Sequence, residues 1–251
     1  MFSHEDQQEE RPKLKTETLI VSDIHLGSEV ARPKAVRKVL ESYDFKRLIL
    51  LGDIFDDLNF TRLKKDHWNL LSYIRKLSNP ERNKEVVWVE GNHDEGLSEI
   101  MSLMMGIKVY DEYMWESGGR SFLAIHGHQF DRFLTENVLI SNVSSYVYDK
   151  VQKWDSETQS ISRFIKRKSK SWLRLSNKIA SEAIEYARGK SADTVICGHT
   201  HQSITVSSEG ISYYNTGCWT DIPSNYIAIG NDGIVKILEE SPALPARRNA
   251  S

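Results

Sequence analysis

The chain has 251 residues, of which 27% are charged, and a formal net charge of −2 at pH 7. This near-neutral balance excludes the strongly basic composition typical of nucleic-acid-binding domains, and no apolar stretch approaches the roughly 20 residues that a membrane-spanning helix needs. The length is sufficient for one large domain or for a domain that carries an inserted segment.

Short apolar runs recur along the chain after a polar N-terminal arm, which we predict to be disordered over residues 1–15. The runs that predict strands are residues 18–23, 47–53, 86–92, 121–128, 194–199 and 211–217, with a hairpin over 226–238 that turns at Asn231, Asp232 and Gly233. Helices are predicted near residues 32–43, 60–78 and 96–105. This alternation predicts an α/β domain over residues 16–238, followed by a disordered tail over 239–251.

One segment, residues 130–190, interrupts the alternation. It contains no strand pattern, and its apolar residues follow the spacing of one helix face. Basic side chains surround this face, and no acidic residue occurs between Thr158 and Ser181. We predict an inserted helical cap that is basic on its open side. The alternative is a helix that packs on the core and leaves a solvated basic face, which is the more common cause of such a pattern.

Polar clusters follow five of the predicted strands at their carboxyl ends. They are Asp23 with His25, Asp53 with Asp56 and Asp57, Asn92 with His93 and Asp94, His126 with His128, and His199 with His201. Each cluster alone is also typical of an ordinary turn. Because ligands of open α/β sheets bind beyond the carboxyl ends of the strands, five such clusters together indicate one site.

The residue types in these clusters indicate the metals that they would bind. Carboxylate oxygens, an amide carbonyl and imidazole nitrogens suit divalent ions such as Mn²⁺, Zn²⁺, Fe²⁺ or Co²⁺. Seven protein ligands are more than one ion needs, so we expect two ions, with Mn²⁺ as the first choice. Two adjacent ions hold a phosphoryl group and activate water for in-line attack. The sequence therefore predicts a dinuclear centre for phosphoester hydrolysis.

The motifs D-x-H, G-D-x-x-D, G-N-H-D, H and G-H-x-H occur in this order between Asp23 and His201, and their combination resembles the calcineurin-like metallophosphoesterase superfamily. The resemblance implies a sandwich of two mixed β-sheets flanked by helices. It also implies a role for each motif residue: Asp23, His25 and His201 would bind one ion, Asn92, His126 and His199 the other, and Asp53 would bridge them. His93 would bind a phosphoryl oxygen and protonate the leaving group, and Asp56 would orient His93.

Four further residues lie beside the motifs or outside them. We expect Asp57 and Asp94 to be exposed loop carboxylates, and His67 to be a surface residue. His128 would contact either the substrate or the side chains that surround the metal ligands.

Three features resemble the UDP-2,3-diacylglucosamine pyrophosphatase branch of the superfamily: SDIHLGS (22–28), the helical insertion, and YYNTGCW (213–219). This branch cleaves a nucleotide-sugar lipid to lipid X and UMP in lipid A synthesis, and its insertion holds the acyl chains. By this resemblance, Lys170 and Trp172 would contact the substrate. However, His93 stands where the best-known enzymes of the branch have arginine, which leaves other pyrophosphate or phosphodiester substrates open.

Two other functions are consistent with the motifs. The first is a nuclease or general phosphodiesterase that uses the basic helix against a nucleic-acid backbone. The second is a non-catalytic metal-binding scaffold, which is the less favoured alternative because every metal-ligand position of the motifs is filled.

Two features bear on location. The polar, acidic start MFSHEDQQEERPKLK is unlike a signal peptide. The two cysteines, Cys197 and Cys218, are predicted to be buried reduced thiols, which is typical of cytoplasmic proteins. We therefore expect a cytoplasmic protein, with peripheral contact between its basic helix and the anionic inner face of the membrane.

Overall fold

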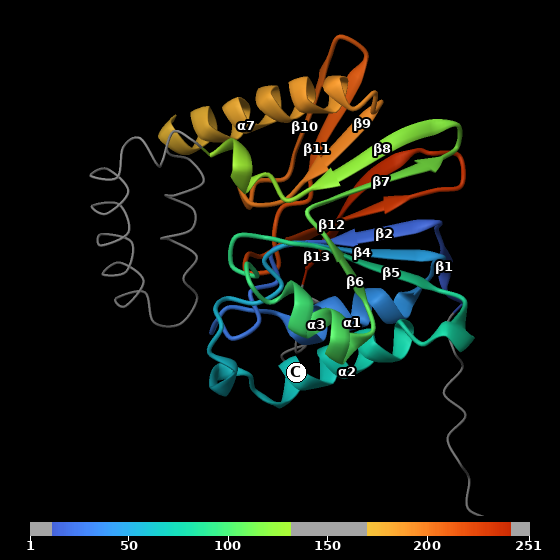
Figure 1. The fold of residues 1–251 in the computed structure, drawn as a ribbon, viewed down its shortest axis with the longest axis vertical. Helices are drawn as coiled ribbons and strands as arrows, with labels where there is room; N and C mark the ends of the chain where they lie inside the picture. The colour runs from blue at the N-terminus through green and yellow to red at the C-terminus, as the bar shows by residue number, and fades with distance from the viewer. Residues whose placement is uncertain (1–11, 132–169, 242–251) are drawn as a thin grey trace, which may run out of the picture.

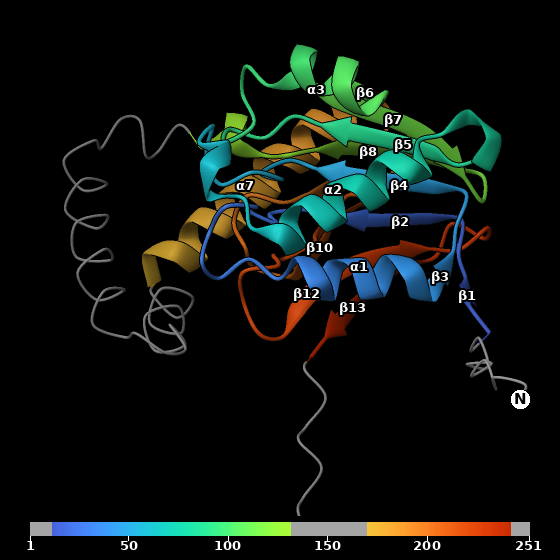
Figure 2. The same ribbon diagram turned by 90° about the horizontal axis from the view of Figure 1, so that it is seen from below.

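Two mixed β-sheets pack face to face in the computed structural model, which describes residues 12–131 and 170–241 (Figure 1). Three helices cover the outer face of the first sheet, and a long helix covers the outer face of the second (Figures 1 and 2). This arrangement confirms the predicted α/β sandwich flanked by helices.

The first sheet has six strands, and its central strands are parallel. In spatial order they are β13 (Val235–Glu240), β12 (Ser224–Ile229), β2 (Thr18–Val21), β4 (Arg47–Leu51), β5 (Glu85–Val89) and β6 (Lys108–Tyr110). Every residue of β2 is buried, as is β4 after its first residue. Such continuous apolar runs are typical of parallel strands that are covered on both faces, and they are the reason that these strands were predictable.

The second sheet has five strands. In spatial order they are β10 (Ile204–Ser208), β11 (Ile211–Asn215), β9 (Thr194–Cys197), β8 (Arg120–Ile125) and β7 (Glu112–Ser117). Strands β8 and β9 are parallel, and β7 and β10 run antiparallel at the two edges. Ile20 and Ile49 of the first sheet and Phe122 of the second belong to the apolar cluster between the sheets.

The helices bury their apolar faces on the outer sides of the sandwich. They are α1 (Pro33–Ser42), α2 (Lys65–Leu77), α3 (Ser98–Met105) and α7 (Lys170–Gly189), with short 3₁₀ turns at Phe60–Arg62, Pro80–Arg82 and His128–Phe130. Pro33 opens α1, where its fixed φ and missing N–H carry no cost. Among the described residues, no helix combines the length and the apolar character that crossing a membrane requires.

Two predicted ends of the domain are wrong by a few residues. Strand β1 (Leu14–Lys15) lies inside the arm that was expected to be disordered over 1–15, because it pairs in parallel with β3 (Tyr43–Asp44). Strand β13 continues to Glu240, inside the expected tail over 239–251, because it pairs with β12 along its whole length. Residues 1–11 and 242–251 lie outside the described residues.

The predicted cap over residues 130–190 is described only in part, since residues 132–169 lie outside the described residues. Its last part is α7, in which Ile179, Ala183 and Ala187 are completely buried against the second sheet. Helix α7 is therefore a core-packing helix, which favours the alternative interpretation for this part of the segment. Arg174 on its opposite side is exposed.

Candidate metal centre

The loops that follow β2 and β4 lie side by side and place the first two motifs together. The backbone amides of Asp23 and His25 donate hydrogen bonds to the carbonyl oxygens of Gly52 and Asp53, at 3.0 Å each. The backbone amide of Trp219 donates to the carbonyl of Asp23 from a third loop, at 3.0 Å. These main-chain hydrogen bonds fix the positions of residues that carry the predicted ligands.

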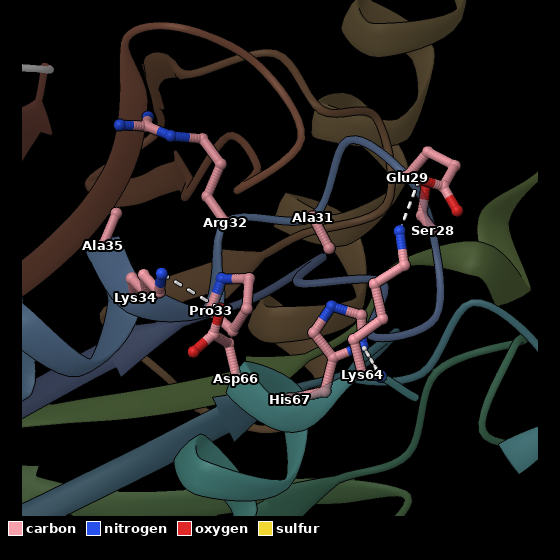
Figure 3. A pocket seen from close by; sticks show the side chains of 10 residues that line it. All are labelled: Ser28, Glu29, Ala31, Arg32, Pro33, Lys34, Ala35, Lys64, Asp66 and His67. Atoms are coloured by element: carbon pink, nitrogen blue, oxygen red, sulfur yellow. Dashed lines mark hydrogen bonds and ion pairs between the residues drawn. The ribbon is translucent and has the colours of Figure 1, made fainter. Parts of the chain in front are cut away.

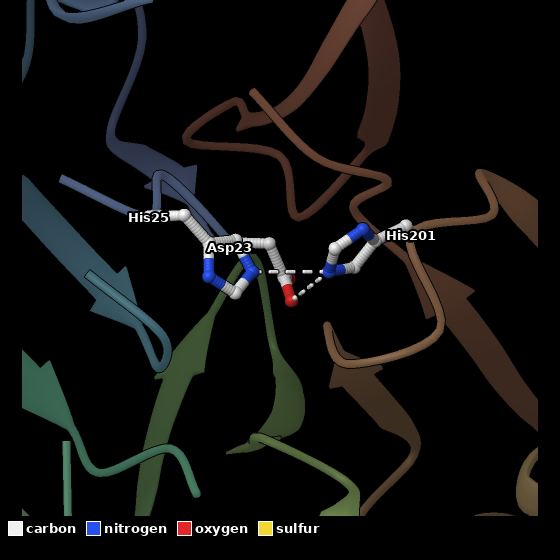
Figure 4. Close-up of side chains that lie close together, drawn as sticks. All are labelled: Asp23, His25 and His201. Carbon is white, nitrogen blue, oxygen red and sulfur yellow. Dashed lines mark hydrogen bonds and ion pairs between the residues drawn. The ribbon is translucent and has the colours of Figure 1, made fainter. Parts of the chain in front are cut away.

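The first group of converging side chains is Asp23, His25 and His201 (Figure 4). The Nε2 atom of His201 lies 3.2 Å from Oδ1 of Asp23 and 3.1 Å from Nε2 of His25. Asp23 and His25 are buried, and one potential ligand atom from each of the three residues lies within 4.8 Å of the others. The structure therefore brings together the three residues predicted to bind one ion.

The second group is Asp53, His126 and His199. Oδ2 of Asp53 lies 3.3 Å from Nε2 of His126 and 3.9 Å from Nε2 of His25, which belongs to the first group. Asp53 therefore lies between the two groups, as expected of a bridging carboxylate. The backbone amide of His93 donates a hydrogen bond to Oδ1 of Asp53, at 2.9 Å. This contact brings the preceding residue, the exposed Asn92, close to Asp53.

The donor atoms of this centre fit divalent metal ions. Among the described residues, the buried atoms Nε2 of His126 and Nδ1 of His25 make no hydrogen bond, and each faces a carboxylate oxygen, at 3.3 Å from Asp53 and 3.5 Å from Asp56. The facing ring nitrogens of His25 and His201 are only 3.1 Å apart. A cation bound between these imidazoles and carboxylates would satisfy the unpartnered atoms, and nitrogen with carboxylate oxygen is a suitable ligand set for Mn²⁺ or Zn²⁺.

The carboxylates and imidazoles of the centre shift each other's pKa values. Burial alone would raise the pKa of Asp53, but His126 holds it well below its ordinary value. Burial alone would lower the pKa of His126, but the carboxylate of Asp53 raises it to about 9. For Asp23, burial again opposes ionisation, and the hydrogen bond with His201 lowers the pKa. The two carboxylates are therefore ionised at neutral pH and ready to bind cations.

Strained backbone marks the same residues. Eight described non-glycine residues have a positive φ, and five of them are predicted metal ligands: Asp23, His25, Asp53, His199 and His201. Left-handed conformations are unfavourable for residues with a Cβ atom and concentrate at functional sites. The strain at these five positions is an independent sign that the centre has a function.

Two glycines allow the loops to approach the carboxylates closely. A Cβ atom at Gly198 would lie 2.5 Å from Oδ2 of Asp23, and one at Gly91 would lie 2.4 Å from Oδ1 of Asp53. Neither distance is compatible with a real side chain. The glycine in each of the G-N-H-D and G-H-x-H motifs is therefore required by the packing of its loop against a metal-binding carboxylate.

His93 and Asp56 meet, but not through the expected groups. Nδ1 of the exposed His93 lies 2.5 Å from the backbone carbonyl oxygen of Asp56, which accepts its hydrogen bond. The carboxylate of Asp56 instead lies 3.5 Å from Nδ1 of His25 and 2.8 Å from the guanidinium of Arg62. The contact with His25 is the main cause of the lowered pKa of Asp56. Asp56 thus orients His93 through the main chain.

Two residues expected at the surface are buried. Asp94 is completely buried, and its oxygens accept hydrogen bonds from the backbone amides of Ile54 and Phe55, at 3.1 and 3.0 Å. Burial raises the pKa of Asp94 to about 7. His67 is also buried, and its Nδ1 accepts a hydrogen bond from the backbone amide of Lys64 at the start of α2. Asp57 is exposed, as predicted, and pairs with Arg62.

The three predicted substrate contacts have different positions. His128 is half-buried, its ring centre lies 5.5 Å from that of His126, and burial lowers its pKa to about 4. The indole Nε1 of Trp172 donates a hydrogen bond to the carbonyl oxygen of Thr200, at 3.1 Å, so it contacts the G-H-x-H loop. Lys170 is the first residue of α7, and its side chain lies outside the described residues.

A separate pocket of about 350 Å³ lies where α1 and α2 begin (Figure 3). Two ion pairs, Lys34 with Asp66 and Lys64 with Glu29, lie between residues of its wall, at 3.2 and 2.7 Å. None of the predicted metal ligands lines it. This pocket is therefore not the metal centre.

Cys197 and Cys218 are both buried, and both are free cysteines in the structure.

Comparison with known proteins agrees with this site. The calcineurin-like phosphoesterase family matches residues 17–203, which include all seven predicted metal ligands. One similar solved structure is a Vps29 mutant from Entamoeba histolytica, with 17% identity and a TM-score of 0.45, and the match covers 89% of this chain and 97% of the other. Another is phosphopantetheinyl hydrolase from Mycobacterium tuberculosis, with 17% identity and a TM-score of 0.48, and the match covers 83% of this chain and 91% of the other. A novel archaeal phosphodiesterase is similar at 13% identity, with a TM-score of 0.47 and coverage of 89% and 99%. No curated protein matches the chain. The chain belongs to the calcineurin-like phosphoesterase family and is a phosphoester hydrolase.

Proposed function

We propose that this protein hydrolyses the diphosphate bond of UDP-2,3-diacylglucosamine to give lipid X and UMP, a step of lipid A synthesis. The observation that carries the proposal is that exposed apolar side chains occur close in sequence to residues of the metal centre. Leu58, two residues after Asp56, is 57% exposed, and Leu173, next to Trp172, is 40% exposed. Apolar side chains at the edge of a polar centre suit a substrate that has both a diphosphate and acyl chains.

The site residues would have separate roles in hydrolysis. Two divalent ions, Mn²⁺ as the first choice, would supply polarisation of the phosphoryl oxygens and a bound water of lowered pKa. Asp23, His25, Asp53, Asn92, His126, His199 and His201 would hold these ions. Nδ1 of His93 donates a hydrogen bond to the carbonyl of Asp56, so Nε2 is the ring nitrogen that would bind the phosphoryl oxygen and, when it carries a proton, give it to the departing group.

A second candidate function is the hydrolysis of a different phosphodiester or pyrophosphate, including a nucleic-acid backbone. His93 favours it, because the best-known lipid-cleaving enzymes have arginine at this position. A histidine here can transfer a proton, whereas arginine remains protonated.

The proposed partner surface is the anionic inner face of the membrane, which the lipid substrate would require. Arg174 on α7 is exposed on the side away from the core, and each basic residue near such a surface adds about 1 kcal/mol of attraction. Co-sedimentation with anionic vesicles at low salt is expected. Binding that is equal for neutral and anionic vesicles would contradict this part of the proposal.

The deciding experiment compares two substrates with the Mn²⁺-loaded protein. One is UDP-2,3-diacylglucosamine in mixed micelles, the other an aryl phosphodiester, and mass spectrometry identifies the products. The Asp53→Ala variant serves as the blank. Release of UMP and lipid X, with weak aryl-ester turnover, is the expected result. Turnover of the aryl ester alone would reject the lipid substrate and favour the second candidate.

A further inference from the structure

The carboxylate of Asp131 contacts a predicted metal ligand although it belongs to none of the motifs. Its Oδ2 atom lies 3.3 Å from Nε2 of His199. The Asp131 side chain is 11% exposed and that of His199 is 17% exposed, so the contact is largely shielded from water. Shielding makes such a charge-assisted hydrogen bond stronger than an exposed one.

The contact determines which nitrogen of His199 remains for a metal ion. A carboxylate accepts hydrogen bonds, so Nε2 of His199 carries the proton and donates a hydrogen bond to Asp131. The unprotonated Nδ1 is then the atom that can bind a cation. Metal-binding histidines commonly donate their other ring N–H to a carboxylate, which fixes the tautomer and makes the ligand nitrogen more basic.

Two further contacts hold the same loop. The backbone amide of His199 donates to the carboxylate of Asp23, at 3.1 Å to each oxygen. The indole of Trp172 donates to the carbonyl of Thr200, between the two histidines of the motif, at 3.1 Å. The loop is thus held at the backbone on both sides of the His199 ring, while Asp131 holds the ring itself.

A purely structural role for Asp131 does not account for its second oxygen. Oδ1 of Asp131 is buried, and none of the residues that the structure describes hydrogen-bonds to it. An ionised carboxylate with an unsatisfied buried oxygen is unfavourable unless positive charge lies close by. A cation on His199 would supply this charge.

We propose that Asp131 is a positioning residue for the ion bound by Asp53, His126 and His199: it accepts a hydrogen bond from Nε2 of His199 and so leaves Nδ1 for the metal, while the indole of Trp172 holds the carbonyl of Thr200 in the same loop. This inference rests on the metal-dependent function proposed above and extends its site by one residue. Asp131 lies five positions after His126, and its role depends on a contact across 68 residues of sequence.

The test measures metal binding without any substrate. Mn²⁺ is titrated into the metal-free protein, and free Mn²⁺ is followed by its electron paramagnetic resonance signal. The variants are Asp131→Ala and Asp131→Asn, with Asp44→Asn as a matched control, because Asp44 is an exposed aspartate that precedes β4, at the opposite end of that strand from Asp53. The expected result is a loss of about 10–100-fold in affinity for one of two ions in Asp131→Ala. A smaller loss is expected in Asp131→Asn, whose amide oxygen can still accept the hydrogen bond.

Thermal unfolding of the metal-free variants separates positioning from folding. The metal-free melting temperatures of Asp131→Asn and the parent protein are expected to agree, whereas the upward shift caused by Mn²⁺ is expected to be smaller in the variant. The proposal would be overturned if Asp131→Ala bound each of the two Mn²⁺ ions with the same affinity as the parent protein. Weaker Mn²⁺ binding in a protein whose parent cleaves no phosphoester would instead reject the proposed function and leave the role of Asp131 standing.

Discussion

Asp53 and His126 meet in a buried contact, in which Oδ2 of the aspartate lies 3.3 Å from Nε2 of the histidine. Burial alone would lower the pKa of His126, but the neighbouring Asp53 carboxylate raises it to about 9. In the metal-free protein, His126 is therefore protonated at neutral pH. A metal ion can bind this nitrogen only by displacing its proton.

Metal binding should accordingly release protons and strengthen with pH. Below the pKa of His126, the metal ion has to compete with a proton, which weakens Mn²⁺ binding by up to about tenfold for each pH unit below that pKa. The Mn²⁺ affinity is therefore expected to rise by up to about tenfold per pH unit between pH 7 and 9 and then to level off. Isothermal titration calorimetry at pH 7.5 in two buffers of different ionisation enthalpy measures the release. A binding enthalpy that is independent of the buffer would contradict a protonated His126.

The close approach of glycines to the carboxylates predicts a second outcome. In Gly198→Ala, the new Cβ atom would displace the Asp23 carboxylate, so we expect loss of the Mn²⁺ bound by Asp23 and at least 100-fold lower activity, roughly the effect of a misplaced catalytic group. The matched control is Gly189→Ala, where a Cβ atom meets no other atom within 4 Å. Metal content after dialysis and circular dichroism check the two variants. Full metal content in Gly198→Ala would show that the loop can move without cost.

Replacement of His93 tests its assigned role as proton donor. We expect His93→Ala to lower kcat by about 10²–10⁴-fold while both metal ions remain bound, because the ring contributes a proton rather than a metal ligand. The loss should be much smaller for an aryl ester whose leaving group needs no proton. Steady-state kinetics with alkyl and aryl esters measures this difference. Equal losses on both substrates would argue against proton transfer by His93.

The buried Asp94 predicts a pH dependence of stability. Burial raises its pKa to about 7 in the folded protein, from an ordinary value of 3.8 in the unfolded chain. Between these values the folded state retains a proton that the unfolded state has released, so this stabilising contribution is present at low pH and is lost as pH rises through 7. Urea unfolding of the metal-free protein, compared with Asp94→Asn, should show the parent protein losing relative stability by at most about 1.4 kcal/mol per unit from pH 5 to 7.

Above pH 7 the difference between the parent protein and Asp94→Asn should stay constant, because Asp94 is then ionised in both states. A difference that does not change between pH 5 and 8 would mean that Asp94 titrates near its ordinary value. Asp94→Ala supplies a second comparison. It leaves the amides of Ile54 and Phe55 without their acceptor, which should cost about 1–3 kcal/mol for each unsatisfied group.

The fold and the metal ligands were predictable because both depend on local patterns. Strands β2 and β4 are continuous apolar runs, and each ends in a ligand motif, so the topology of parallel strands alone brings Asp23 and Asp53 to the same edge. The hairpin of β12 and β13 was marked by its turn residues. The short or polar edge strands β6, β7 and β10 were missed, since their residues form strands only through pairing with neighbours.

The residues whose contacts were not predicted interact with distant parts of the chain. Asp94 resembles a turn residue, and only the fold places Ile54 and Phe55 against its oxygens. Asp131 has no motif around it, and its partner His199 is 68 positions away. Trp172 fits an apolar helix face equally well whether it lines a pocket or donates to Thr200. The spacing of residues along the chain predicts the ligands of a metal ion, but it does not predict the residues that orient those ligands.

The positive φ angles at the ligand positions restrict how this protein can change during evolution. Glycine, asparagine, aspartate and histidine adopt such angles more readily than other residues, whereas valine or isoleucine would be strongly unfavourable there. Descendants that lose catalysis but keep the fold should therefore carry glycine or asparagine at Asp23, Asp53 or His199, and β-branched residues should be absent. The backbone would thus preserve a trace of the metal centre after its chemistry had been lost.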